Sequence, residues 1–221
     1  MSTVADPFAF LSPAAAEGAV LRTPMERHHR AAGAEFEDRD GWRLADYPSN
    51  GEAPAWAADI SQHGKIDVRG SAGQIDELTG SLDLGRANST DGVWTLRLSP
   101  THAVVLCPFD RVAELSERIG AGVVDMTCGW AAVVLGGSAA REVFMRSSSL
   151  DVREHRFPPG ACMAGSVMRC GSIILNDHDR FWVLCGWEFG EYMWESLLDA
   201  GAMLGITAVS AAAVLRSEVA A

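Results

Sequence analysis

Residues 22–47 read RTPMERHHRAAGAEFEDRDGWRLADY, and this stretch sets how the chain enters its fold. Thr23 precedes Pro24, and Glu26 follows three residues after Thr23. This spacing is typical of a helix start, with threonine as the cap and proline at the first helical position. Because glycine often ends a helix, the sequence predicts a short helix that stops at Gly33.

The chain around this stretch predicts an α+β fold with antiparallel sheets. Residues 34–58 contain Gly, Pro, Asn and Asp throughout and predict a loop, whereas residues 59–70, DISQHGKIDVRG, alternate and predict a strand. Since neighbouring strands pair locally and helices return between them without a regular strand–helix–strand alternation, an antiparallel α+β fold is expected. The other predicted elements are helices at 72–79, 111–119, 139–147, 189–204 and 208–218, and strands at 93–98, 102–107, 130–137, 171–175 and 180–186.

Polar residues mark three further helix starts. Ser71 and Gln74 have the spacing of a capping box before a helix that ends at Gly80. Asp110 and Ser138 stand where they would cap the two helices that follow. Residues 1–21 are rich in Ala and Pro without a clear period, so we expect an N-terminal arm followed by one domain over 22–221.

Charge and composition exclude several classes of function. The chain has 29 acidic and 18 basic residues and a net charge of −11, which argues against a nucleic-acid partner. Lys65 is its only lysine. The five cysteines form no CxxC pair, so we expect reduced thiols and no metal site. The longest apolar stretch, 131–140, is too short to cross a membrane, and the first residues lack a signal-peptide pattern. These features predict a cytoplasmic protein without a membrane partner.

Several motifs, in order, resemble the aminomethyltransferase family, which contains the T-protein of glycine cleavage. The segment 22–70 is similar to that family's entry segment and to its DVSH.GK strand. DMTCGWAAVVLGGSAAREVF at 125–144 and WESLLDAGAMLGITAVSAAAVLRSE at 194–218 are similar to later motifs. The matching positions in the entry segment are Thr23, Pro24, His29, Gly33, Ala34, Gly41, Trp42, Tyr47, Asp59, Ser61, Gly64 and Lys65.

The second half looks like one branch of this family, the gamma subunit of heterotetrameric sarcosine oxidase. LDVREHRFPPGACMAGSVMRCGSIIL at 150–175, followed by EYMWESL, carries that likeness. The resemblance implies a T-protein-like fold without the separate C-terminal barrel. It also implies a central pocket that holds tetrahydrofolate in one-carbon transfer. The gamma subunit itself is not known as the catalytic part of the oxidase complex.

Three departures from the family argue against ordinary folate-dependent aminomethyl transfer. The region of the family's GG.LDD motif keeps only Asp91, and its VNA motif has become Leu106-Cys107-Pro108. The glutamate that pairs with the pterin falls at about Trp182. A carboxylate accepts two hydrogen bonds, whereas an indole donates one, so Trp182 could stack on a pterin without replacing that contact.

The candidate site residues follow from the resemblance and from strand alternation. His29 belongs either to a substrate pocket or to helix packing, and Trp42 either to the pocket or to the core. Ser61, His63 and Lys65 share one face of the predicted strand, where they form either an anion site or a polar sheet face. The candidate catalytic residues are His63, Asp59 and His29, and the candidate binding residues are Trp42, Tyr47, Ser61, Lys65 and Trp182.

The segment 176–179, Asn-Asp-His-Asp, contains metal-ligand residue types, but turn chemistry explains it better. Two functional hypotheses remain. One is an auxiliary subunit that partners a flavin-dependent N-methyl amine oxidase or associates with itself. The other is a compact stand-alone enzyme that transfers one-carbon groups or binds another small molecule in its central pocket.

Overall fold

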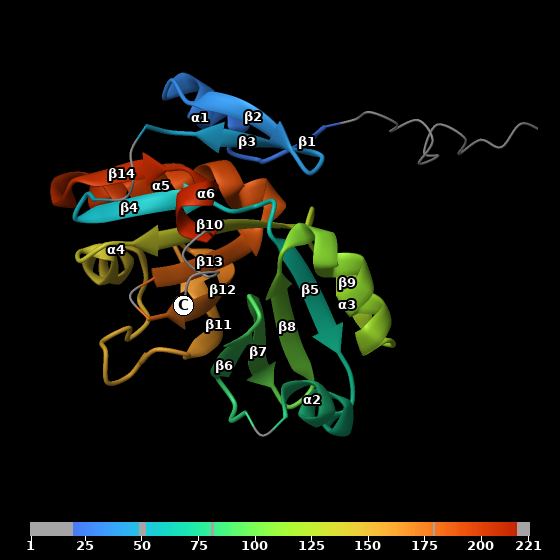
Figure 1. Cartoon of the computed structure of the whole chain (residues 1–221). Helices are drawn as coiled ribbons and strands as arrows, with labels where there is room; N and C mark the ends of the chain where they lie inside the picture. The colour runs from blue at the N-terminus through green and yellow to red at the C-terminus, as the bar shows by residue number, and fades with distance from the viewer. Residues whose placement is uncertain (1–19, 49–51, 81, 179, 216–221) are drawn as a thin grey trace, which may run out of the picture.

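The computed structural model describes residues 20–48, 52–80, 82–178 and 180–215, which form three β-sheets and flanking helices (Figure 1). The predicted α+β class with antiparallel sheets is confirmed, although β1 pairs with β3 and β14 pairs with β4 in parallel. The predicted arm, apart from residues 20 and 21, lies outside the described residues. None of the described helices is long and apolar enough to cross a bilayer.

The strands fall into sheets of six, five and three. In spatial order, the six-stranded sheet contains β11 (Cys162–Val167), β12 (Cys170–Asp177), β13 (Arg180–Gly186), β10 (Trp130–Gly136), β4 (Ala55–Asp59) and β14 (Ile206–Val209). The five-stranded sheet contains β6 (Arg86–Thr90), β7 (Val93–Ser99), β8 (His102–Cys107), β5 (Gly64–Arg69) and β9 (Val123–Asp125). The three-stranded sheet contains β1 (Leu21–Arg22), β3 (Trp42–Asp46) and β2 (Glu35–Arg39).

The helices are short and flank these sheets. The α-helices are α1 (Glu26–Ala31), α2 (Ala72–Thr79), α3 (Val112–Ile119), α4 (Ala140–Ser147), α5 (Gly190–Gly201) and α6 (Ala211–Leu215). Within the described residues, the 3-10 turns are η3 (Phe109–Arg111), which lies beside α3, and η4 (Trp187–Phe189) and η5 (Ala202–Leu204), which lie beside α5.

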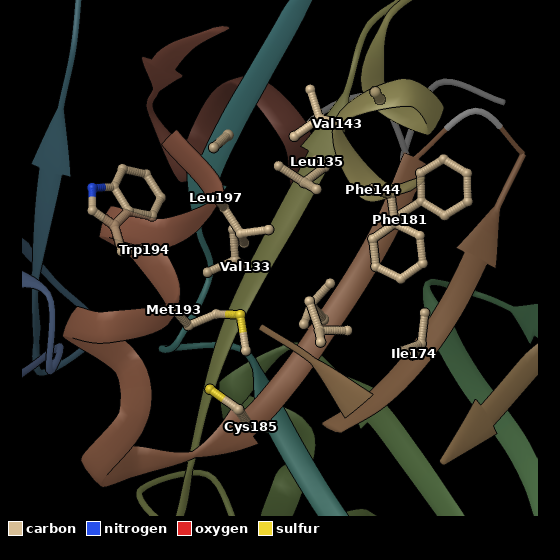
Figure 2. Packing of buried hydrophobic residues seen from close by; sticks show 14 of the residues in the cluster. Val133, Leu135, Val143, Phe144, Ile174, Phe181, Cys185, Met193, Trp194 and Leu197 are labelled. Atoms are coloured by element: carbon tan, nitrogen blue, oxygen red, sulfur yellow. The ribbon is translucent and has the colours of Figure 1, made fainter. Parts of the chain in front are cut away.

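The six-stranded sheet is buried on both faces. Along β10, Val133 and Leu135 lie on the face covered by α4 and α5, in one cluster with Leu197, Val143 and the stacked rings of Phe144 and Phe181 (Figure 2). Val134, next to them in the chain, packs on the opposite face against side chains of the five-stranded sheet. Since both faces of β10 are covered, its sequence is a continuous apolar run rather than an alternating one.

The predicted loop at 34–58 is wrong, because this region contains β2, β3 and β4. Strands β2 and β3 form a hairpin whose turn, Asp40-Gly41, has positive φ at both residues. Asp-Gly is the usual sequence for such a two-residue turn, and it is the signal that could have identified the hairpin. The alternating pattern was weak because β2 is mostly exposed and charged.

The single strand predicted at 59–70 is also wrong. Strand β4 ends at Asp59, a turn follows, and β5 begins at Gly64 in a different sheet. Ser61 and His63 therefore lie in the turn, and only Lys65 lies on β5. The prediction that Ser61, His63 and Lys65 share one strand face is therefore wrong.

The cap predictions had mixed outcomes. The capping box of Ser71 and Gln74 is present, and α2 has the predicted limits. Thr23 does not cap α1, which begins at Glu26, and neither Asp110 nor Ser138 caps the helix that follows it. A 3-10 turn occupies the residues after Pro108, so α3 starts beyond the reach of Asp110.

The C-terminal region differs from its prediction at two places. Residues 206–209 form the edge strand β14, so the last helix starts at Ala211 rather than at 208. Asn176 and Asp177 belong to β12 and are buried, so β12 extends into the segment predicted as a turn. The predicted hairpin is confirmed, because β12 and β13 pair antiparallel. The short edge strands β6, β9 and β11 were not predicted.

Candidate functional site

The entry segment ends in a buried hydrogen-bond network rather than on an open surface. One ring nitrogen of His29 lies 2.9 Å from the Asp59 carboxylate, and the other lies 2.8 Å from the Tyr47 hydroxyl. Asp59 also accepts hydrogen bonds from the Thr23 hydroxyl and from the Ser61 backbone N–H. His29 of helix α1 therefore links Asp59, at the end of strand β4, to Tyr47, which directly follows strand β3. We call these five residues the entry network.

Burial and hydrogen bonding shift the pKa values of two residues in the entry network, Asp59 and Tyr47. Burial alone would raise the pKa of Asp59, but the hydrogen bonds and charge of His29, with help from Thr23 and Ser61, hold that pKa below its usual value. Burial and the neighbouring Asp59 charge raise the pKa of Tyr47 to about 12. The carboxylate thus stays ionised and its lone pairs are engaged by protein donors, an arrangement that stabilises structure.

Lys65 holds the turn between β4 and β5. Its ammonium group is buried and donates to the backbone carbonyls of Ser61, at 2.7 Å, and of His63, at 2.8 Å. The Ser61 hydroxyl in turn accepts a hydrogen bond from the backbone N–H of Ala132 on β10. Burial lowers the pKa of Lys65 to about 7, although Asp59 acts in the opposite direction. Lys65 and Ser61 therefore position the residues of this turn.

The pKa of Lys65 predicts a pH-dependent stability. Folded Lys65 loses its proton near pH 7, whereas the unfolded chain keeps it until about pH 10.5, so stability rises with pH in this window. Between about pH 7 and 8.5, the free energy of unfolding of the wild type should rise by about 1.5 kcal/mol relative to Lys65→Met. Urea denaturation across this range measures the difference. Parallel curves for the two proteins would contradict the assignment.

The pH range must end below the usual thiol pKa. Burial raises the pKa of Cys107, Cys162 and Cys185 to about 12, and this effect lowers stability above pH 9. The comparison with Lys65→Met cancels this thiol contribution only if the thiols have the same pKa values in both proteins. Measurements that end at pH 8.5 do not depend on that assumption.

A cavity of about 650 Å³ lies where the three sheets meet. Residues from the β2–β3 hairpin, the β4–β5 turn, the β6–β7 turn, the start of η3 and the start of α6 line it. Its wall is mostly apolar, and its charged residues are exposed at the mouth. The lining residues are Arg39, Asp40, Trp42, Leu44, Gln62, His63, Asp91, Gly92, Pro108, Phe109, Asp110, Ala211 and Ala212.

His63 is a buried polar group on the cavity wall. It is 4 % exposed, and its ring lies edge-on to Trp182 at a centroid distance of 5.3 Å. Burial, with a smaller contribution from the Lys65 charge, lowers the pKa of His63 to about 3. Its Nε2 has no hydrogen-bond partner in the described part of the chain. The imidazole is therefore neutral at physiological pH.

The structure separates the predicted site residues into two groups. Trp42 and His63 line the cavity, whereas His29, Tyr47 and Asp59 belong to the entry network. Ser61 and Lys65 support the turn, and Trp182 lies in the core behind His63. Sequence reasoning missed the cavity residues Asp40, Leu44, Phe109 and Asp110. The Asp-Gly pair at 40–41 was the signal that could have pointed to the first of them.

The residues present do not fit the pterin contact of the family. Trp182 is 1 % exposed, lies outside the cavity lining and donates its indole N–H to Asp177 over 3.4 Å. It can neither accept a bidentate hydrogen bond nor stack on a ligand in the cavity. Among the described lining residues, the carboxylates are exposed at the mouth and none is buried in the wall.

The described residues also contain no group of three or more His, Cys, Asp or Glu side chains arranged to hold a metal ion. Four cysteines are buried and Cys128 is exposed, all as free thiols. What the cavity offers chemically is a mostly apolar wall with exposed charged residues, three aspartates and Arg39, around it.

The comparison with protein families supports the resemblance seen in the sequence. Residues 94–203, about half of the chain, match the sarcosine oxidase, gamma subunit family. This segment runs from β7 to η5 and includes most of the six-stranded sheet. The resemblance to this family that the sequence motifs indicated is thus confirmed. No curated protein is a significant match to the whole sequence.

Two solved structures share the fold. A chain of heterotetrameric sarcosine oxidase from Corynebacterium sp. U-96 superposes with a TM-score of 0.64 and 16 % identity, over 85 % of this chain and 97 % of that one. The glycine cleavage system aminomethyltransferase T from Bartonella henselae superposes with a TM-score of 0.71 and 18 % identity. That match covers 88 % of this chain but only 60 % of the aminomethyltransferase. The T-protein-like fold is therefore confirmed.

Proposed function

We propose that the chain is an auxiliary subunit of the sarcosine oxidase gamma type and that it works in a complex with a flavin-dependent N-methyl amine oxidase. The observation that carries this proposal is the family match over residues 94–203. The structural match supports it, because it takes in 97 % of a chain from a sarcosine oxidase heterotetramer. We therefore expect this chain to be a subunit of the same kind of complex.

The entry network removes the main argument for a catalytic subunit. The entry residues that match the aminomethyltransferase family would be expected in a catalytic subunit if they formed its active site. Instead, His29 and Asp59 are buried and bonded to each other, to Thr23 and to Tyr47. A general acid or base must reach the proton it transfers, and these two groups lie outside the cavity lining. Their retention is explained by folding, which a non-catalytic subunit also needs.

The proposal does not include tetrahydrofolate. The resemblance puts the family's carboxylate at about Trp182, and Trp182 is buried and lies outside the cavity lining. The cavity favours a second function, the binding of a different small molecule, either in the assembled complex or by a stand-alone protein. Its volume is within the range of small-molecule sites.

Purification of the affinity-tagged chain from its own cells tests the proposal. We expect a stable complex with a flavin-containing protein, and sarcosine-dependent oxygen consumption by that complex. The same tag on an unrelated protein of the same cells is the control for adventitious capture. Deletion of the gene for this chain should lower the amount of assembled oxidase.

A monodisperse chain that purifies without any flavoprotein, together with unchanged oxidase in the deletion strain, would overturn the auxiliary role. Turnover of a one-carbon donor by the chain alone would support the stand-alone enzyme instead.

A further inference from the structure

The cavity where the three sheets meet has an apolar wall that faces open space. Leu44, Pro108 and Phe109 line the cavity, and each of them is partly exposed. We call these three residues the apolar wall. Burial of apolar surface contributes about 25 cal/mol per Å², so an apolar occupant that covers this wall would be stabilised.

The start of the described chain lies directly beside this cavity. The backbone N–H of Leu21 donates a hydrogen bond of 2.8 Å to the carbonyl oxygen of Gly41, and Leu21 lies opposite Trp42 in the parallel pairing of β1 with β3. Asp40 and Trp42, the two neighbours of Gly41, both line the cavity. Because β1 and β3 run in the same direction, the chain that precedes Leu21 joins the fold at the Asp40 end of β3, beside the cavity.

The segment that precedes Leu21 contains an apolar run without charge. Residues 7–16 read PFAFLSPAAA, in which Phe8, Phe10 and Leu11 are the large apolar side chains. An extended chain spans about 3.3 Å per residue, so the ten residues from Leu11 to Leu21 reach as far as about 30 Å. Since Leu21 is bonded to a direct neighbour of the lining residues, this run can reach the cavity.

The chemistry of the run fits the cavity. A segment without charged side chains enters an apolar site without the desolvation penalty of a buried charge. The charged lining residues are exposed around the cavity, so the occupant does not have to neutralise them. A segment tethered beside a site also has an effective concentration in the millimolar range, which favours its binding over that of a free molecule.

We propose that residues 7–11 of this chain dock in the cavity, with their three large apolar side chains against the apolar wall. A small molecule then enters the cavity only after this segment leaves it, so the segment regulates access. This inference goes beyond the proposed oxidase subunit, because it concerns a contact within the chain itself.

Photo-cross-linking of the full chain tests the contact directly. Phe10 is replaced by the photoreactive p-benzoylphenylalanine, the dilute protein is irradiated, and the linked peptides are identified by mass spectrometry. We expect cross-links within one chain to residues 39–44 and 108–110. The matched control carries the same photoreactive residue at Tyr192, an aromatic side chain that is 47 % exposed and outside the cavity lining, and should give none of these links.

Binding of Nile red, an uncharged apolar dye, tests the regulation of access. If the segment leaves about one-tenth of the cavities open, the variant Phe8→Ser/Phe10→Ser/Leu11→Ser should bind the dye about 10-fold more tightly than the wild type does. The matched control replaces three exposed apolar residues outside the cavity lining, Val124→Ser/Met145→Ser/Met203→Ser, and should not strengthen dye binding.

Three results would overturn the proposal. Cross-links from position 10 that avoid the cavity residues would place the segment elsewhere, and cross-links found only between two chains would make a second copy the occupant. Equal dye binding by the wild type and by the segment variant would show that the segment does not close the cavity. None of these results bears on copurification with a flavoprotein, so the two proposals fail separately.

Discussion

Replacing Asp59 by alanine should lower the free energy of unfolding by about 3–5 kcal/mol, the usual cost of removing one partner from a buried ion pair. The carboxylate is buried and accepts hydrogen bonds from Thr23, His29 and the backbone N–H of Ser61. The substitution leaves these donors without an acceptor, and each unsatisfied buried donor adds a desolvation cost. Urea denaturation monitored by circular dichroism measures the loss.

Asp38→Ala is the matched control for this prediction. Asp38 makes a two-point ion pair with Arg43 on the same three-stranded sheet, but its carboxylate is 47 % exposed. Its loss should cost far less than the loss of Asp59, as expected for a surface pair that solvent screens. If Asp59→Ala folded as stably as Asp38→Ala, the entry network would not hold the fold, and a catalytic role for Asp59 would regain its basis.

The entry network shows what the sequence could predict and what it could not. The resemblance to the aminomethyltransferase family singled out Thr23, His29, Tyr47 and Asp59, and these four residues do come together. A sequence motif does not record whether such residues face one another or face a ligand. Only their burial and mutual distances separate the two cases, and these depend on strand β3, which was not predicted.

The strands that were predicted well are those with strong apolar signals. Strands β7, β8, β10 and β13 are long, rich in branched and aromatic residues and buried, and their predicted limits agree with the structure to within one residue. Strands β2, β6 and β9 lie at sheet edges, where exposed polar side chains weaken the period. Their positions depend on pairing with distant segments, which local pattern does not contain.

The cavity could not be predicted for the same reason. Asp40 and Asp91 are far apart in the sequence and belong to different sheets. Each Asp-Gly pair predicts a local turn, but nothing local says that the two turns meet. Trp42 was identified through the family resemblance, and His63 through a strand alternation that the structure does not have.

Acidification should destabilise the protein through His63. Burial is the main reason that the pKa of folded His63 is lowered to about 3 from its ordinary value of 6.5. As pH falls below 6.5, this histidine takes up a proton in the unfolded chain but not in the folded one. Proton binding therefore stabilises the unfolded state relative to the folded state. Stability is thus fully present above pH 6.5 and is lost progressively toward pH 3. Between about pH 7 and 4 the expected loss from this residue is about 3 kcal/mol.

The comparison of His63→Gln with the wild type isolates this contribution from other acid-titrating groups. The difference between their free energies of unfolding should change by about 3 kcal/mol over the same pH range, since glutamine does not titrate. His155→Gln, at an exposed position, removes one histidine without removing a buried one, and its acid profile should follow the wild type. If His63→Gln also followed the wild type, the folded imidazole would accept a proton as readily as the unfolded one. The wall of the cavity would then carry a positive charge in acid.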